Sequence, residues 1–120
     1  MLGYKLFTSG LSDLAVSAIG NDVNAGISAA GTDQAGATEL SNCLNGVTTV
    51  ASASGVRLYA GSAGDWQLVF NGGANPLRVY PFTGAKINQL AANSPHVLQI
   101  NTACIYFTLS TTQVVGVLSA

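Results

Sequence analysis

Charged side chains are scarce in this chain, where four Lys or Arg and five Asp or Glu among 120 residues make up 8%. Soluble domains usually carry about a quarter charged residues. The net charge is −1, so the chain lacks the basic stripe that binds nucleic acid and the polybasic patch that attracts a protein to a membrane surface. We therefore expect no nucleic-acid partner and no membrane partner, and we expect much of the surface to contact protein.

Long apolar runs are also missing. No stretch approaches the roughly 20 apolar residues that a membrane-spanning helix needs. Residues 1–20 contain no continuous apolar block of the kind found in a signal peptide. We expect a protein that is made in the cytoplasm and leaves its cell by lysis or as part of a particle.

Residues that could catalyse a reaction or bind a metal are few. Cys43 and Cys104 are the only cysteines, too few for a disulfide scaffold and without neighbouring zinc ligands. We predict that both are small buried residues; one disulfide between them and a reactive thiol are the alternatives. The single histidine, His96, is expected in a loop or at the surface. The carboxylates stand mostly beside turn residues and are predicted to cap turns: Asp13, Asp22, Asp33, Glu39 and Asp65. We expect no cofactor, no metal and no enzyme activity.

Short alternating segments separated by turn residues fill the chain from Gly31 onward. The predicted strands cover 35–40, 47–52, 56–59, 66–70, 77–81, 96–100, 104–109 and 113–118. The pair Asn45-Gly46 predicts a tight hairpin, and Ser110–Thr112 separates the last two strands. Such short strands are typical of an all-β protein, here a compact antiparallel β-sandwich or barrel. We expect one β domain over residues 31–120 behind an extended N-terminal arm with the first strands over residues 1–30; a short helix over Ser12–Ile19 is the alternative within the arm.

Two aromatic segments are candidates for the core and for contacts. In residues 66–70 the side chains of Trp66, Leu68 and Phe70 share one face of the strand, which predicts that Trp66 belongs to the core. Arg78, Tyr80 and Phe82 share one face of the next strand. Because Arg and aromatic residues are enriched at interface hot spots, we predict that these three form an exposed subunit contact. An aromatic face that stacks on carbohydrate is the alternative.

The order of several short motifs resembles a module of tailed-phage virion proteins. The motifs are Gly31–Leu40, Val47–Val50, Gly55–Leu58 and the pattern V-Y-P-x-x-G-x-x-I-N at Val79–Asn88. The resemblance spans about residues 31–109. Such modules occur in head decoration proteins and in tail fibre or tail-associated proteins, so the resemblance implies a structural protein of a bacteriophage virion.

From this resemblance we expect a capsid decoration (cement) protein that binds the outer capsid surface and stabilises the shell. Its partners would be the major capsid protein and itself, as a homotrimer that suits local three-fold points. It would be made in the host cytoplasm. Tyr4, Leu6 and Phe7 in the arm are predicted to contact the capsid by adding a strand to an exposed edge. The alternative is a tail fibre or tail-tip component with a receptor-binding or glycan-binding face.

Overall fold

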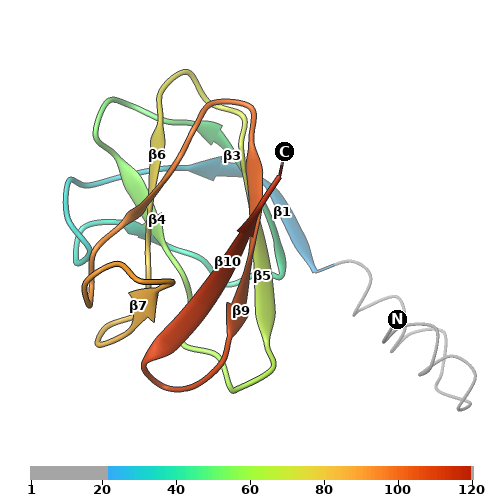
Figure 1. Cartoon of the computed structure of the whole chain (residues 1–120). Coiled ribbons are helices and arrows are strands. Elements are labelled where there is room, and N and C mark those ends of the chain that lie inside the picture. The colour runs from blue at the N-terminus through green and yellow to red at the C-terminus, as the bar shows by residue number, and fades with distance from the viewer. Residues whose placement is uncertain (1–21, 120) are drawn as a thin grey trace, which may run out of the picture.

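The computed structural model describes residues 22–119, and residues 1–21 and 120 lie outside the described part. Within residues 22–119 the chain forms ten strands and no helix (Figure 1). The strands are β1 (Val23–Ser28), β2 (Thr38–Glu39), β3 (Leu44–Thr49), β4 (Gly55–Arg57), β5 (Trp66–Asn71), β6 (Leu77–Tyr80), β7 (Lys86–Ile87), β8 (His96–Leu98), β9 (Ala103–Thr108) and β10 (Gln113–Leu118). No helix able to cross a membrane occurs among these residues.

The strands form two sheets, and the chain alternates between them. The six-stranded sheet has the order β1-β3-β5-β9-β10-β7, and the four-stranded sheet has the order β2-β4-β6-β8. Strands β1, β3 and β5 lie parallel, as do β2, β4 and β6. Each pair from β1–β2 to β5–β6 is therefore one turn of a coil, and this connectivity is that of a β-solenoid (Figure 1).

The register gives the number of residues in each coil. Val23 pairs with Leu44, and Leu44 pairs with Leu68, so the chain returns to the same position after roughly 20 to 25 residues, as in known repeat architectures. After β6 the direction reverses. Strands β8 and β9 run antiparallel to β6 and β5, and β10 folds back on β9.

These pairings correct the predicted antiparallel sandwich or barrel. The all-β class is confirmed, but five of the eight strand pairs within the described residues are parallel. The segments predicted at 66–70, 77–81 and 113–118 are strands, and Ser110–Thr112 does join β9 to β10 as a hairpin. Most other turns carry the chain to the opposite sheet, because turn residues mark where a strand ends but not which strand it pairs with next.

The predicted hairpin at Asn45-Gly46 is wrong, because both residues lie inside β3. The Asn45 side chain is 1% exposed, and its Nδ2 donates to the carbonyl oxygens of Asn42 at 2.8 Å and Leu68 at 3.1 Å. Gly46 does not adopt the left-handed conformation. A Cβ there would lie 3.3 Å from the Cα of Ala25 on β1, so this glycine allows two neighbouring strands to approach closely.

The core lies between the two sheets and is aliphatic with one large aromatic ring. It includes Val47, Val69, Cys104 and Tyr106 from the six-stranded sheet and Val56, Leu77, Val79 and Leu98 from the four-stranded sheet, each at most 1% exposed. Because these residues all point inward, the alternate residues of the same strands point out of the molecule. The core therefore determines which side chains the outer faces present.

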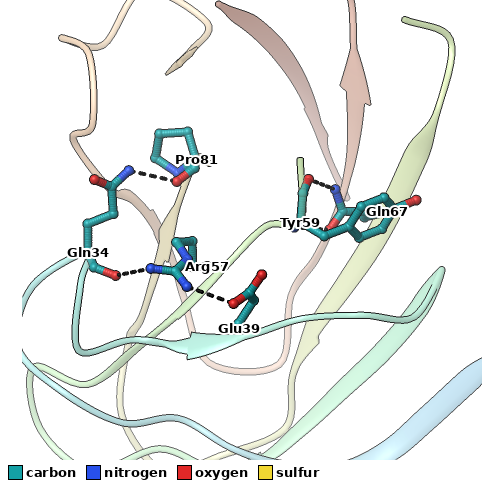
Figure 2. A network of polar contacts seen from close by, with 6 residues as sticks. All are labelled: Gln34, Glu39, Arg57, Tyr59, Gln67 and Pro81. Atoms are coloured by element: carbon teal, nitrogen blue, oxygen red, sulfur yellow. Dashed lines mark hydrogen bonds and ion pairs between the residues drawn. The ribbon is translucent and has the colours of Figure 1, made fainter. Parts of the chain in front are cut away.

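Buried amides hold the turns that connect the sheets. Gln67 on β5 is 1% exposed, and its side chain accepts a hydrogen bond from the Tyr59 amide at 3.1 Å and donates one to the Tyr59 carbonyl at 3.2 Å (Figure 2). Asn71, at the other end of β5, donates to the carbonyls of Asn75 and Leu98. These contacts set the inward face of β5 and leave its apolar alternate residues outside.

Candidate functional site

The outer face of the six-stranded sheet carries a continuous row of aliphatic side chains. The row runs through five adjacent strands, because the register pairs Val23 with Leu44, Leu44 with Leu68, Leu68 with Ile105, and Ile105 with Val117. We call it the middle row. Its ends are the most open, with Val23 47% and Val117 55% exposed. Five strands far apart in the chain thus build one apolar line.

Aromatic side chains flank the middle row on both sides. On one side Trp66 pairs with Phe107, which pairs with Val115; on the other side Phe70 pairs with Ala103. The aromatic residues Trp66, Phe70 and Phe107 are 38%, 39% and 38% exposed. The middle row and these flanking residues together form the apolar face: Val23, Leu44, Trp66, Leu68, Phe70, Ala103, Ile105, Phe107, Val115 and Val117.

Charge is confined to the borders of the apolar face. The outward positions of β1, β3, β5, β9 and β10 within the described residues hold no charged side chain. Asp22 and Asp65 directly precede β1 and β5, and Lys86 lies on the edge strand β7. Continuous exposed apolar surface of this kind is unusual on a monomeric protein and marks a contact site. The face has the chemistry of a protein interface.

The predicted core position of Trp66 is wrong. Apolar residues at 66, 68 and 70 do share a face, but it is the outer one, and Gln67, Val69 and Asn71 point inward with at most 1% exposure. Periodicity alone does not say which face of a strand is buried. One feature of the sequence did indicate an apolar outer face: β9 and β10 have apolar residues at consecutive positions. Strands with apolar side chains on both faces are normally covered on both faces.

The predicted contact residues of β6 lie in different surroundings from those expected. Arg78 is half-buried, but Tyr80 and Phe82 are only 5% and 7% exposed, so the expectation of an exposed aromatic patch is wrong. Arg78 and Tyr80 do share the outward face of β6 with Val79 inward. The connection from β1 to β2 covers this face, since the Tyr80 hydroxyl donates to the Thr32 carbonyl at 3.3 Å.

Polar contacts fix that covering connection to the four-stranded sheet. Gln34 donates from its side-chain Nε2 to the Pro81 carbonyl at 2.8 Å. The backbone carbonyl of Gln34 accepts a hydrogen bond from Arg57 Nη1 at 3.3 Å. Arg57 also pairs with Glu39 at 2.8 Å (Figure 2). The Glu39 side chain is 64% exposed, so the ion pair itself contributes little. The network attaches the connection to the outward side of β4 and β6.

His96 lies on β8 and not in a loop, and it is half-buried. Its Nδ1 is 2.7 Å from the Tyr106 hydroxyl, and the two rings meet edge to face with centroids 5.8 Å apart. Burial lowers the pKa of His96 below its ordinary value of 6.5. Burial also raises the pKa of Tyr106, so this hydroxyl keeps its proton. The pair therefore links the two sheets through one hydrogen bond between two neutral groups.

The cysteines are free thiols, and they differ in burial. Cys104 is 1% exposed, as predicted for a small core residue. Cys43 is only half-buried; its Sγ lies 3.4 Å from the Trp66 carbonyl. Burial, followed by the negative charges of Asp22 and Asp65, raises the pKa of the Cys43 thiol. A raised pKa disfavours the thiolate, so the surroundings of Cys43 do not activate it as a nucleophile.

Two hollows on the described part are open to solvent. One hollow of about 240 Å³ lies between β1 and β2 and is lined mainly by Asn, Ser and Thr side chains. Another of about 270 Å³ lies beside Arg78 and Val97. Within residues 22–119 no group of three or more His, Cys, Asp or Glu is arranged to hold a metal ion. The predicted capsid contacts Tyr4, Leu6 and Phe7 lie outside the described residues.

Comparison of the chain with protein-family models, with curated proteins and with solved structures finds no match.

Proposed function

We propose that the protein is a structural component of a protein assembly, and specifically a decoration (cement) protein on the outer capsid surface of a tailed phage. The observation that carries the structural role is the apolar face, ten outward side chains on five strands without a charged group. A face of this kind is stabilised by contact with protein, because contact removes its apolar area from water.

The assignment to a phage virion is supported by the order of motifs from Gly31 to Asn88 that resembles a virion module. The structure gives these motifs particular positions. Gly31–Leu40 is the connection that covers the four-stranded sheet and ends at β2, Gly55–Leu58 contains β4, and Val79–Asn88 runs from β6 to β7. Val47–Val50 includes the end of β3 in the six-stranded sheet. The motifs therefore come from both sheets, and none of them contains a residue of the apolar face.

In this proposal the shell contact lies in the arm, at Tyr4, Leu6 and Phe7, and the partner there is the major capsid protein. The test is co-sedimentation of the purified chain with empty shells of that capsid protein, over a range of concentrations. We expect saturable binding and a higher temperature of shell disruption. A triple variant with Tyr4→Ala, Leu6→Ala and Phe7→Ala should fold normally but lose shell binding. Failure of the wild-type chain to sediment with shells would contradict the proposal.

One observation favours a second function, a tail-associated protein that binds glycans. Trp66 and Phe107 are exposed neighbours on β5 and β9, and aromatic platforms can stack on sugar rings. Sugars also need hydrogen-bonding partners, and the apolar face offers only the indole N–H of Trp66 among its ten side chains. Binding of the chain to host cells or to a panel of glycans, abolished by Trp66→Ala, would support this function over the capsid role.

A further inference from the structure

We propose that the apolar face is the contact between two copies of this chain, which pack face to face about a two-fold axis. This inference names the partner of the face on which the proposed structural role rests. The partner is thus a surface of known chemistry: apolar, uncharged and built from five strands.

The distribution of charge favours a second copy over a foreign protein. Interfaces between different proteins are oriented by complementary polar and charged groups, and the outward positions of these five strands within the described residues hold no charge. Asp65 directly precedes Trp66 and borders the face beyond that end of β5, whereas Asp22 directly precedes Val23 at the outer end of the middle row. A two-fold axis parallel to the middle row places the Trp66 ends of β5 at opposite sides of the pair, so the Asp65 carboxylates of the two copies do not meet.

The relief of the face is also self-complementary. Along β5 the exposed rings of Trp66 and Phe70 stand on either side of the half-buried Leu68, and on β9 the exposed Phe107 stands beside the half-buried Ile105. If the axis runs between the row of Trp66 and the middle row, the Trp66 row of each copy lies over the middle row of the other copy, and the Phe70 row lies outside this overlap. Side chains of two such sheets interdigitate at a spacing of about 10 Å.

The area of the contact suits a weak pair. Five strands about 4.8 Å apart and the two rows of side chains that overlap cover roughly 20 by 10 Å in each copy. With protruding side chains, a pair buries on the order of several hundred Å² in total, which is below the roughly 1,200 Å² of standard interfaces and in the range of weak, transient ones. We therefore expect a dimer that dissociates on dilution, with a dissociation constant of about 10 micromolar or weaker.

Symmetry distinguishes this pair from the trimer expected for three-fold points. A single patch that binds its own copy gives a closed two-fold dimer, whereas a ring of three needs two different patches on each subunit. The apolar face of the described part is one continuous patch on five strands, whereas the outward side of β6 is covered by the β1–β2 connection. An icosahedral shell has two-fold as well as three-fold axes, so a paired subunit is compatible with the proposed role.

Trp66 is the only tryptophan in the chain and lies on the apolar face, so its fluorescence reports directly on what covers the face. The experiment is sedimentation velocity of the full chain across a wide dilution series, with the emission maximum and the acrylamide quenching of Trp66 measured on the same samples. We expect dimers at high concentration and monomers at low concentration. As the protein is diluted through the range in which dimers dissociate, the Trp66 emission maximum should shift to the red and its quenching by acrylamide should increase.

Two matched variants place the contact. Phe107→Glu puts a carboxylate on the apolar face, and Val97→Glu puts one at a 46% exposed position on β8 of the other sheet. We expect Phe107→Glu to weaken the dimer at least 10-fold, and Val97→Glu to dimerise like the wild type. The wild-type dilution series keeps the test valid if Phe107→Glu fails to fold.

Four outcomes would overturn the inference. A monomer at every concentration with an accessible Trp66 would assign the face to a foreign partner. A monomer with a shielded Trp66 would assign it to the chain's own residues 1–21. A trimer, or a dimer that Phe107→Glu leaves intact, would place self-association elsewhere. Shell binding is measured separately, so a chain that dimerises but does not sediment with shells refutes the capsid role and not the dimer.

Discussion

At the scale of single residues, buried amide side chains bind backbone carbonyls where the chain enters or leaves the strands. Asn45, Gln67 and Asn71 are each at most 1% exposed, and each donates to a backbone carbonyl that no strand pairing satisfies. A buried carbonyl without a donor costs about 1 to 3 kcal/mol. These side chains therefore contribute to stability through the backbone groups that they satisfy, and their replacement has a larger effect than their size suggests.

Asn45→Asp tests this role. The substitution keeps the shape but replaces the donor Nδ2 with a carboxylate oxygen that faces the carbonyls of Asn42 and Leu68 at 2.8 and 3.1 Å. We expect a loss of about 3 kcal/mol or more in the free energy of unfolding, because a buried charge is left without a partner. Urea unfolding measures it. Asn24→Asp, at the exposed register partner on β1, is the control and should change stability by less than about 0.5 kcal/mol.

His96 predicts how stability depends on pH. Burial lowers its pKa in the folded state, so the unfolded chain binds the proton more tightly than the folded chain. The free energy of unfolding should therefore decrease as the pH falls through 6.5, the ordinary pKa of the group. The chain has one histidine, so His96→Gln should remove most of the dependence between pH 7 and 5. A melting temperature that stays constant in the wild type over this range would contradict the prediction.

At the scale of elements, the connection between β1 and β2 determines which outer face stays open. Gly31 adopts a φ of 72° within it, and the connection covers Tyr80 and is held by Gln34 and Arg57. Gly31→Ala should destabilise the protein by about 2 kcal/mol or more, since its Cβ would lie 2.4 Å from the carbonyl group of Gly36. Gly26→Ala is the matched control, because nothing lies within 4 Å of a Cβ there.

The measurement is thermal unfolding of both glycine variants beside the wild type. Equal stability of Gly31→Ala and Gly26→Ala would mean that the connection does not pack on the sheet as described.

The elements also show what the sequence could predict. The alternation in residues 66–70 and the turn at Ser110–Thr112 gave β5 and the β9–β10 hairpin, because local periodicity and turn preferences are encoded in neighbouring residues. Pairing between coils is not local. Val23, Leu44 and Leu68 occupy equivalent positions, but the residues around them share no repeated motif, so the parallel connectivity could not be inferred from the sequence. For the same reason the apolar face was not predicted: its residues become neighbours only through that connectivity.

At the scale of the whole molecule, the two sheets share one core. Residues from both contribute to it, and the His96–Tyr106 contact joins β8 of one sheet to β9 of the other. We therefore expect one cooperative unfolding transition instead of separate melting of the coils. Far-ultraviolet circular dichroism and Trp66 fluorescence should give the same midpoint in urea at a fixed protein concentration. Two separated midpoints would show that the coils lose structure independently.

The middle row is assembled from five strands that extend from Val23 to Val117. A nascent chain cannot present it until β10 has been synthesised and paired with β9, nor can a chain in which any one of the five strands is out of register. Pairing through this row would consequently act as a quality check, admitting complete subunits to an assembly and leaving truncated or misfolded ones without a binding surface.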